Sequence, residues 1–157
     1  MPSLVKLFAY SFGATVFYQC YHFVGTVVYC EGISMEPTVR DGDYMLVERL
    51  SIYFRRIKKG DIIIARQYCE HDNCNFVLKR IQAVEGDTVN YVSPKLRKPV
   101  TVQIPKDHVW IEGDNKEHSL DSRTYGSIPY EELEYRVVLR LLPVASFGWV
   151  DKGKQFK

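Results

Sequence analysis

The sequence lacks the features that mark several common classes of protein. Its 157 residues carry 21 basic and 19 acidic side chains, so neither sign of charge dominates. The basic residues are scattered rather than gathered in a stripe, which argues against nucleic acid as a partner. The metal-protease motif His-Glu-x-x-His is absent, as are internal repeats and low-complexity segments. The length suits one catalytic domain with short appendages.

Paired metal-binding cysteines are also missing. The four cysteines form no paired Cys-x-x-Cys motif, so a structural zinc site is not expected. Cys69, His71 and Cys74 could hold a metal ion, but no fourth ligand follows nearby. We expect a reduced loop or a small disulfide there, and neither a metal nor a cofactor in the protein.

Charge is missing altogether from Leu7 to Cys30. At ~1.5 Å per residue, a helix of this length would cross a ~30 Å hydrocarbon core. The run does not end in the small residues that precede a cleavage site, so it predicts a retained membrane anchor over residues 1–30. The single flanking charges, Lys6 and Glu31, weakly favour an N-terminus on the cytoplasmic or matrix-like side.

Polar residues recur within this run at spacings of three and four, which would place them on one face of a helix. They are Ser11, Thr15, Gln19, His22 and Thr26. A polar face turned toward lipid is costly, so the pattern predicts either docking on a partner helix or a helix lying in the membrane interface.

After Glu31 the pattern changes to short runs rich in Val, Ile and aromatic residues, which is typical of strands. The expected strands are 44–47, 61–65, 76–84, 100–104, 108–111 and 136–142. Gly-Asp dipeptides at residues 42, 60, 86 and 113 predict tight turns with glycine at positive φ. We therefore expect a mainly β fold, small and partly closed, with a catalytic domain over residues 31–150 and a polar tail over 151–157.

Two elements carry candidate chemistry. In the expected strand 76–84, Lys79 shares a face with Val77, Ile81 and Ala83, and burial there would lower its pKa so that a neutral amine can act as a base. Alternatively, the lysine only extends its amine to water from a strand edge. Ser34 follows the anchor in a loop with glycine and proline, where a serine is either a nucleophile awaiting a base or an ordinary turn residue. In that loop Gly32 is expected to let another backbone approach closely.

Several motifs in order resemble those of the type I signal peptidases. They are Gly32-Ile33-Ser34-Met35-Glu36-Pro37-Thr38, Lys79-Arg80 with Glu85-Gly86-Asp87, Glu112-Gly113-Asp114-Asn115, and Ser119-Leu120-Asp121-Ser122-Arg123 with Gly126. The resemblance implies that Ser34 is the nucleophile and Lys79 its general base. Members from the endoplasmic reticulum carry histidine at the lysine position, so the likeness is to the bacterial and organellar branch.

Within that branch the chain looks most like the mitochondrial inner membrane proteases. The resemblance implies cleavage of signal or sorting peptides of precursors in the intermembrane space, by an inner-membrane enzyme that works with a second related catalytic subunit. It also implies that Ser119 orients the lysine, while Asp121 and Arg123 pair to brace the loop. Asp114 and Asn115 are interpreted as turn formers.

One position departs from some bacterial members, which carry a hydroxyl oxyanion donor two residues before the nucleophile. Here that position is Gly32, which leaves the Ser34 backbone N–H as the oxyanion donor. The competing hypotheses are a bacterial-type peptidase for exported preproteins, a non-catalytic subunit of such a complex, a self-cleaving repressor with a related fold and a metal-dependent hydrolase. Both Ser34 and Lys79 are present, and this argues against the non-catalytic subunit.

Overall fold

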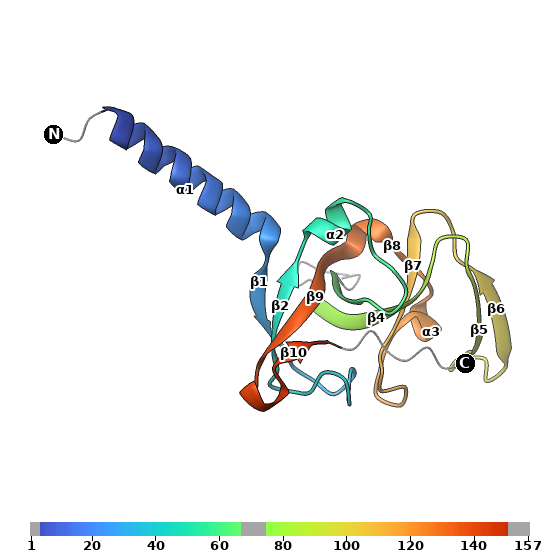
Figure 1. Ribbon diagram of the computed structural model, residues 1–157. Coiled ribbons are helices and arrows are strands. Elements are labelled where there is room, and N and C mark those ends of the chain that lie inside the picture. The colour runs from blue at the N-terminus through green and yellow to red at the C-terminus, as the bar shows by residue number, and fades with distance from the viewer. Residues whose placement is uncertain (1–3, 67–74, 151–157) are drawn as a thin grey trace.

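The computed structural model describes residues 4–66 and 75–150, apart from the side chains of residues 5 and 19–24. An N-terminal helix, α1 (Leu4–Val24), projects away from a β-body that holds all the strands (Figure 1). Among the described residues, no helix combines the length and the apolar character needed to cross a membrane. The uncharged run is divided between α1 and the strand β1 (Thr26–Tyr29), which joins the main sheet.

The polar stripe predicted on this helix is only partly helical. Thr26 lies in β1, opposite Val47, so its place on the helical face was wrong. The hydroxyls of Ser11 and Thr15 donate to backbone carbonyls one turn earlier, at 3.0 and 2.9 Å. These two hydroxyls are satisfied within the helix and need no partner, whereas the side chains of Gln19 and His22 lie outside the described residues.

All six predicted strands are confirmed, with ends shifted by at most a few residues. They correspond to β2 (Tyr44–Glu48), β3 (Ile62–Arg66), β4 (Phe76–Val84), β6 (Pro99–Gln103), β7 (His108–Glu112) and β9 (Leu133–Leu142). Sequence patterns missed β1, β5 (Thr88–Val92), β8 (Ile128–Pro129) and β10 (Gly148–Trp149). The short helices are α2 (Leu50–Tyr53), α3 (Ser122–Tyr125), η1 (Tyr130–Glu132) and η2 (Val144–Ser146).

The main sheet is antiparallel and runs in the order β1-β2-β9-β3-β4-β7-β8, with β10 added to β9. A separate hairpin of β5 and β6 stands at the end of the body farthest from α1 (Figure 1). Both faces of the sheet are packed, as the strand β3 shows: Ile62 and Ile64 join one apolar cluster and Ile63 and Ala65 another. This explains why β3 is a continuous run of buried aliphatic residues rather than an alternating one.

Candidate active site

Ser34 and Lys79 meet across the structure, 45 positions apart in the sequence, with the lysine Nζ 2.8 Å from the serine Oγ. Among the described residues this is the one hydrogen bond that the Lys79 amine makes. The distance is that of a nucleophile and a base poised for proton transfer. The turn serine and the strand lysine of the sequence thus form a specific pair in the structure.

Lys79 is held in the interior of strand β4. It pairs with Ile63 of β3, and only 4% of the residue is exposed. Val77 and Ile81 pack in the same cluster as Ile63, as the strand pattern predicts, whereas Ala83 lies beyond a register shift and joins a different cluster. Burial lowers the pKa of Lys79, and the negative charge of Asp121 partly opposes this shift.

The loop that carries Ser34 is anchored on both sides of the serine. Met35 and Val39 are buried in the first apolar cluster, and the loop is closed by hydrogen bonds between the backbones of Cys30 and both Gly42 and Asp43. These contacts fix the serine at the edge of the core. The backbone N–H of Ser34 donates to none of the described residues, which leaves it available as a donor to an oxyanion.

Gly32 does not play the part expected from the sequence. A β-carbon at this position would meet nothing within 4 Å, so the glycine is not required for a close approach of another backbone. It is required for the turn, because its φ is +93°. Its N–H donates to Asp41 Oδ1 at 2.7 Å, so it is already engaged within the loop.

The close approach occurs instead at Gly113, the only one of the four Gly-Asp glycines that does not adopt positive φ. A β-carbon here would lie 2.3 Å from Ser119 Oγ and 2.5 Å from the Ser34 carbonyl oxygen. The neighbouring Asn115 donates its backbone N–H to that same carbonyl at 3.0 Å and its side-chain amide to the Ile33 carbonyl at 3.1 Å. Asn115 therefore clamps the nucleophile loop, a role that the interpretation as a turn former missed.

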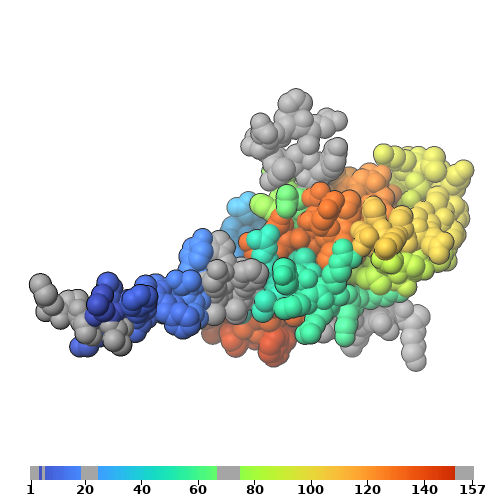
Figure 2. Space-filling model, turned by 90° about the horizontal axis from the view of Figure 1, so that it is seen from above, coloured from blue at the N-terminus to red at the C-terminus, as the bar shows by residue number. Residues whose placement is uncertain are grey.

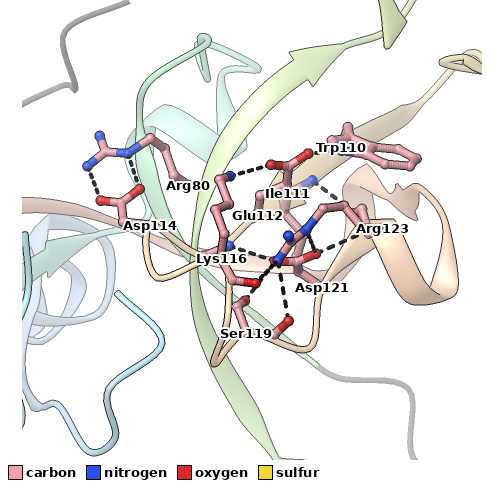
Figure 3. Close-up of polar contacts among 11 residues, drawn as sticks. Arg80, Trp110, Ile111, Glu112, Asp114, Lys116, Ser119, Asp121 and Arg123 are labelled. Atoms are coloured by element: carbon pink, nitrogen blue, oxygen red, sulfur yellow. Dashed lines mark hydrogen bonds and ion pairs between the residues drawn. The ribbon is translucent and has the colours of Figure 1, made fainter. Parts of the chain in front are cut away.

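Asp121 is the centre of the last motif and is completely buried. It accepts hydrogen bonds from the Ser119 hydroxyl at 2.7 Å, the Gly113 N–H at 3.0 Å and the Arg123 guanidinium at 2.9 and 3.0 Å (Figure 3). Burial alone would raise the pKa of Asp121, but the bonds from Arg123, Gly113 and Ser119 outweigh it and hold the pKa below its usual value. The carboxylate is therefore charged at neutral pH.

This arrangement changes the part predicted for Ser119. Its hydroxyl donates to Asp121 and makes no hydrogen bond to Lys79 among the described residues. Ser119 and Arg123 support the carboxylate, and the carboxylate acts on Lys79 through its charge. Loop bracing by Asp121 and Arg123 agrees with the pairing that the motif implied.

A second ion pair, which the sequence did not single out, lies beside the dyad. Arg80 donates from Nε and Nη2 to the two carboxylate oxygens of Asp114, at 2.8 and 2.6 Å (Figure 3). It also donates from Nη1 to the Gly60 carbonyl at 2.8 Å. Both side chains are largely buried, and Arg80 reaches Thr38 of the nucleophile loop at 3.4 Å. Two features of the sequence could have indicated this pair: Arg80 directly follows Lys79, and Asp114 belongs to the Glu-Gly-Asp-Asn motif.

The other reactive groups near the site do not offer a competing chemistry. Cys30 lines the cavity beside Ser34 as a free thiol, but burial, with the charge of Asp43, raises its pKa to about 11. A thiol with that pKa is a poor nucleophile at neutral pH. In the part of the chain that the structure describes, no cluster of three or more His, Cys, Asp and Glu side chains could hold a metal. The Cys69, His71 and Cys74 group lies outside the described residues.

The family model "Signal peptidase, peptidase S26" matches residues 3–97 and 94–142 of the chain. The chain belongs to the signal peptidase S26 family. It is 43% identical to mitochondrial inner membrane protease subunit 1 of Xenopus tropicalis over 141 residues, which cover 87% of this chain and 83% of the relative. The corresponding subunit of Homo sapiens is 38% identical over 143 residues, 88% of this chain and 85% of the relative. The expected likeness to the mitochondrial branch is confirmed.

Among solved structures, the chain resembles a signal peptidase I from Enterococcus faecalis V583. The match covers 50% of this chain and 93% of that one, with 20% sequence identity and a TM-score of 0.40.

Proposed function

We propose that this S26 family member is a serine endopeptidase that removes signal or sorting peptides from precursors, with Ser34 as nucleophile and Lys79 as general base. The observation that carries the proposal is the 2.8 Å contact between Lys79 Nζ and Ser34 Oγ, made by a lysine whose pKa burial lowers. A serine hydroxyl needs a neighbouring base to become nucleophilic, and only a neutral amine can be that base. The same pair supports catalysis over the alternative of a non-catalytic subunit.

The reaction begins when neutral Lys79 takes the proton of Ser34 Oγ as that oxygen bonds to the carbonyl carbon of the scissile peptide. The resulting oxyanion accepts a hydrogen bond from the Ser34 N–H. The Lys79 ammonium then donates its proton to the leaving amine as the C–N bond breaks, which leaves an ester on Ser34. Lys79 next takes a proton from water, the hydroxide displaces Ser34 Oγ, and the returned proton restores the serine.

An open strand edge next to the dyad suits a peptide substrate. β7 pairs with β4 only from Arg80 onward, so within the described pairings residues 76–79 of β4 have β3 on one side and no strand on the other. An extended peptide can add to such an edge through backbone hydrogen bonds. The adjoining cavity of about 120 Å³, lined by Met35, Val39, Leu78 and the dyad, would receive one small or medium side chain.

The names of the relatives support a location and a partner for this protein. Proteins 38–43% identical to this chain are named as subunits of a mitochondrial inner membrane protease. We therefore place this protein at the inner membrane, with α1 and membrane lipid in contact and the β-body facing the intermembrane space. The word "subunit" in those names supports a second related catalytic subunit as partner.

The test is cleavage of a signal-bearing precursor by the purified full-length chain. Ser34→Ala should give no cleavage, while the same change at Ser127, a half-buried serine directly before β8 and outside the dyad, should keep full activity. Lys79→Arg should also be inactive, because a guanidinium does not deprotonate at working pH. Substantial cleavage by Lys79→Arg would assign the base to another residue.

A further inference from the structure

The segment between β2 and β3 is strongly basic. Residues 49–59 contain Arg49, Arg55, Arg56, Lys58 and Lys59 and no acidic residue. Three of these cations are neutralised by ion pairs, Arg49 with Glu134, Arg55 with Asp107 and Lys59 with Asp87. The side chains of Arg56 and Lys58 form no ion pair with a described residue and are exposed.

Two exposed aromatic side chains belong to the same segment, and one of them contacts Arg56. Tyr53 is 71% exposed and Phe54 is 56% exposed, with their rings 5.2 Å apart. The Arg56 guanidinium stands 5.4 Å from the Phe54 ring. Together Tyr53, Phe54, Arg56 and Lys58 form what we call the α2 surface.

Buried side chains and hydrogen bonds fix the backbone that carries the α2 surface. Ser51 and Ile57 are buried, and Ile52 packs against the second apolar cluster. The Tyr130 hydroxyl donates to the Ile52 carbonyl at 3.3 Å, and Glu48 accepts from the Ser51 N–H at 2.9 Å. Ile52 and Ile57 therefore face the core. Tyr53 and Phe54 are exposed although the backbone around them is fixed.

The position of this surface relative to α1 indicates its partner. β1 begins two residues after α1 ends, and its first residue, Thr26, pairs with Val47, three residues before α2 begins. The α2 surface is consequently at the end of the body from which α1 projects (Figure 1). In the view from above, the segment around position 55 is uncovered and lies in the half of the body nearer α1, while the β5–β6 hairpin lies at the end away from α1 (Figure 2).

We infer that the α2 surface binds the headgroup layer of an anionic bilayer, with Arg56 and Lys58 on lipid phosphates and the Tyr53 and Phe54 rings at the interface. Aromatic rings beside basic side chains are the composition that this layer favours. The exposed apolar side chains of α1, among them Leu7, Phe8 and Phe12, would bring the membrane to the same end of the body. The inference rests on the proposed membrane location and is independent of the proteolytic chemistry.

The β5–β6 hairpin provides a matched control. Its turn also carries exposed basic residues, Lys95 and Lys98, beside an exposed leucine, Leu96, but it is remote from α1 (Figure 1). If basic and apolar composition alone caused binding, the hairpin and the α2 surface would behave alike.

The test is hydrogen–deuterium exchange of the full-length chain reconstituted in vesicles of phosphatidylcholine alone and of phosphatidylcholine with phosphatidylglycerol. Each cation near an anionic surface contributes roughly fivefold to binding, so Arg56 and Lys58 together should favour docking of the α2 surface by about 25-fold in the anionic vesicles, and exchange of amides 52–58 should be slower there. Arg56→Gln with Lys58→Gln should abolish this difference, and Lys95→Gln with Lys98→Gln should preserve it. Cleavage of a soluble peptide by both variants, measured in parallel, reports on the catalytic proposal separately.

Equal exchange in the two kinds of vesicle would overturn the inference, as would a slowing that survives Arg56→Gln with Lys58→Gln. Protection that requires an added protein and no anionic lipid would also overturn it, in favour of an acidic protein surface as the partner.

Discussion

Gly113 lies so close to Ser34 that a β-carbon on the glycine would stand 2.5 Å from the serine carbonyl oxygen. The same β-carbon would lie 2.3 Å from Ser119 Oγ, so the glycine packs between the nucleophile loop and the motif that holds Asp121. The contact joins two segments that each hold part of the site. Disturbing this contact should therefore lower the catalytic rate more than it lowers the stability of the fold.

Gly113→Ala should lower kcat by about 100-fold, because a displacement of the order of 1 Å at a reacting group costs that much. Circular dichroism should show a folded protein. Gly86→Ala is the matched control, since Gly86 has φ +84° but no atom within 4 Å of the added methyl group. That variant should lose about 1 kcal/mol of stability and keep its activity. Equal activity losses in the two variants would mean that backbone strain, and not the contact with Ser34, is what matters.

Asp121→Asn should move the acid limb of the pH–rate profile to lower pH. The Asp121 charge opposes the lowering of the Lys79 pKa, so its removal lets that pKa fall further and leaves more neutral amine at a given acidic pH. Ser119→Ala removes one hydrogen bond and keeps the carboxylate charge, so its acid limb should stay in place while the rate falls less than it does without Lys79. A shift toward higher pH in Asp121→Asn would contradict this account of the charge.

Lys79→Met should stabilise the folded protein at neutral pH although it removes the base. Burial lowers the Lys79 pKa, so between that value and 10.5 the unfolded chain binds more protons and wild-type stability rises with pH. The variant lacks this dependence. Its advantage in Tm should be largest on the acid side of the window and shrink toward pH 10.5. A constant difference in Tm across the window would show that Lys79 titrates alike in both states.

Asp114→Asn should destabilise the protein by about 3–5 kcal/mol, because it leaves the buried Arg80 guanidinium without its carboxylate. Burial would raise the Asp114 pKa, but Arg80 and Thr38 hold it below 3.8. The stabilisation is thus present above pH 3.8 and is lost as the pH falls through the lower folded value. Urea unfolding of the wild type and the variant should converge in acid. Replacing Asp114 by Leu and Arg80 by Met together should lower the free energy of unfolding by less than Asp114→Asn does. A larger loss in the double variant would show that the unpaired Arg80 charge is not the cause of the destabilisation.

The sequence predicted the strands better than the contacts between them. Runs of Val, Ile and aromatic residues placed β4 at residues 76–84, the range that the structure has, because local composition determines such strands. The pairing of Lys79 with Ser34 could not be derived from spacing and came from the family resemblance, since the residues are 45 positions apart. Arg80 with Asp114 and Asn115 with Ile33, separated by 34 and 82 positions, were missed for the same reason. The family resemblance pairs Ser119 with Lys79, whereas in the structure the Ser119 hydroxyl donates to Asp121.

The most direct test of the dyad is a double-mutant cycle on precursor cleavage, with Ser34→Ala, Lys79→Ala and the combined variant assayed under identical conditions. Because a nucleophile and its base act as one unit, each single variant should lose essentially all cleavage, and the combined variant should be no slower than either. Near-normal cleavage by either single variant, or a combined loss equal to the product of the two single losses, would contradict the Ser34–Lys79 mechanism.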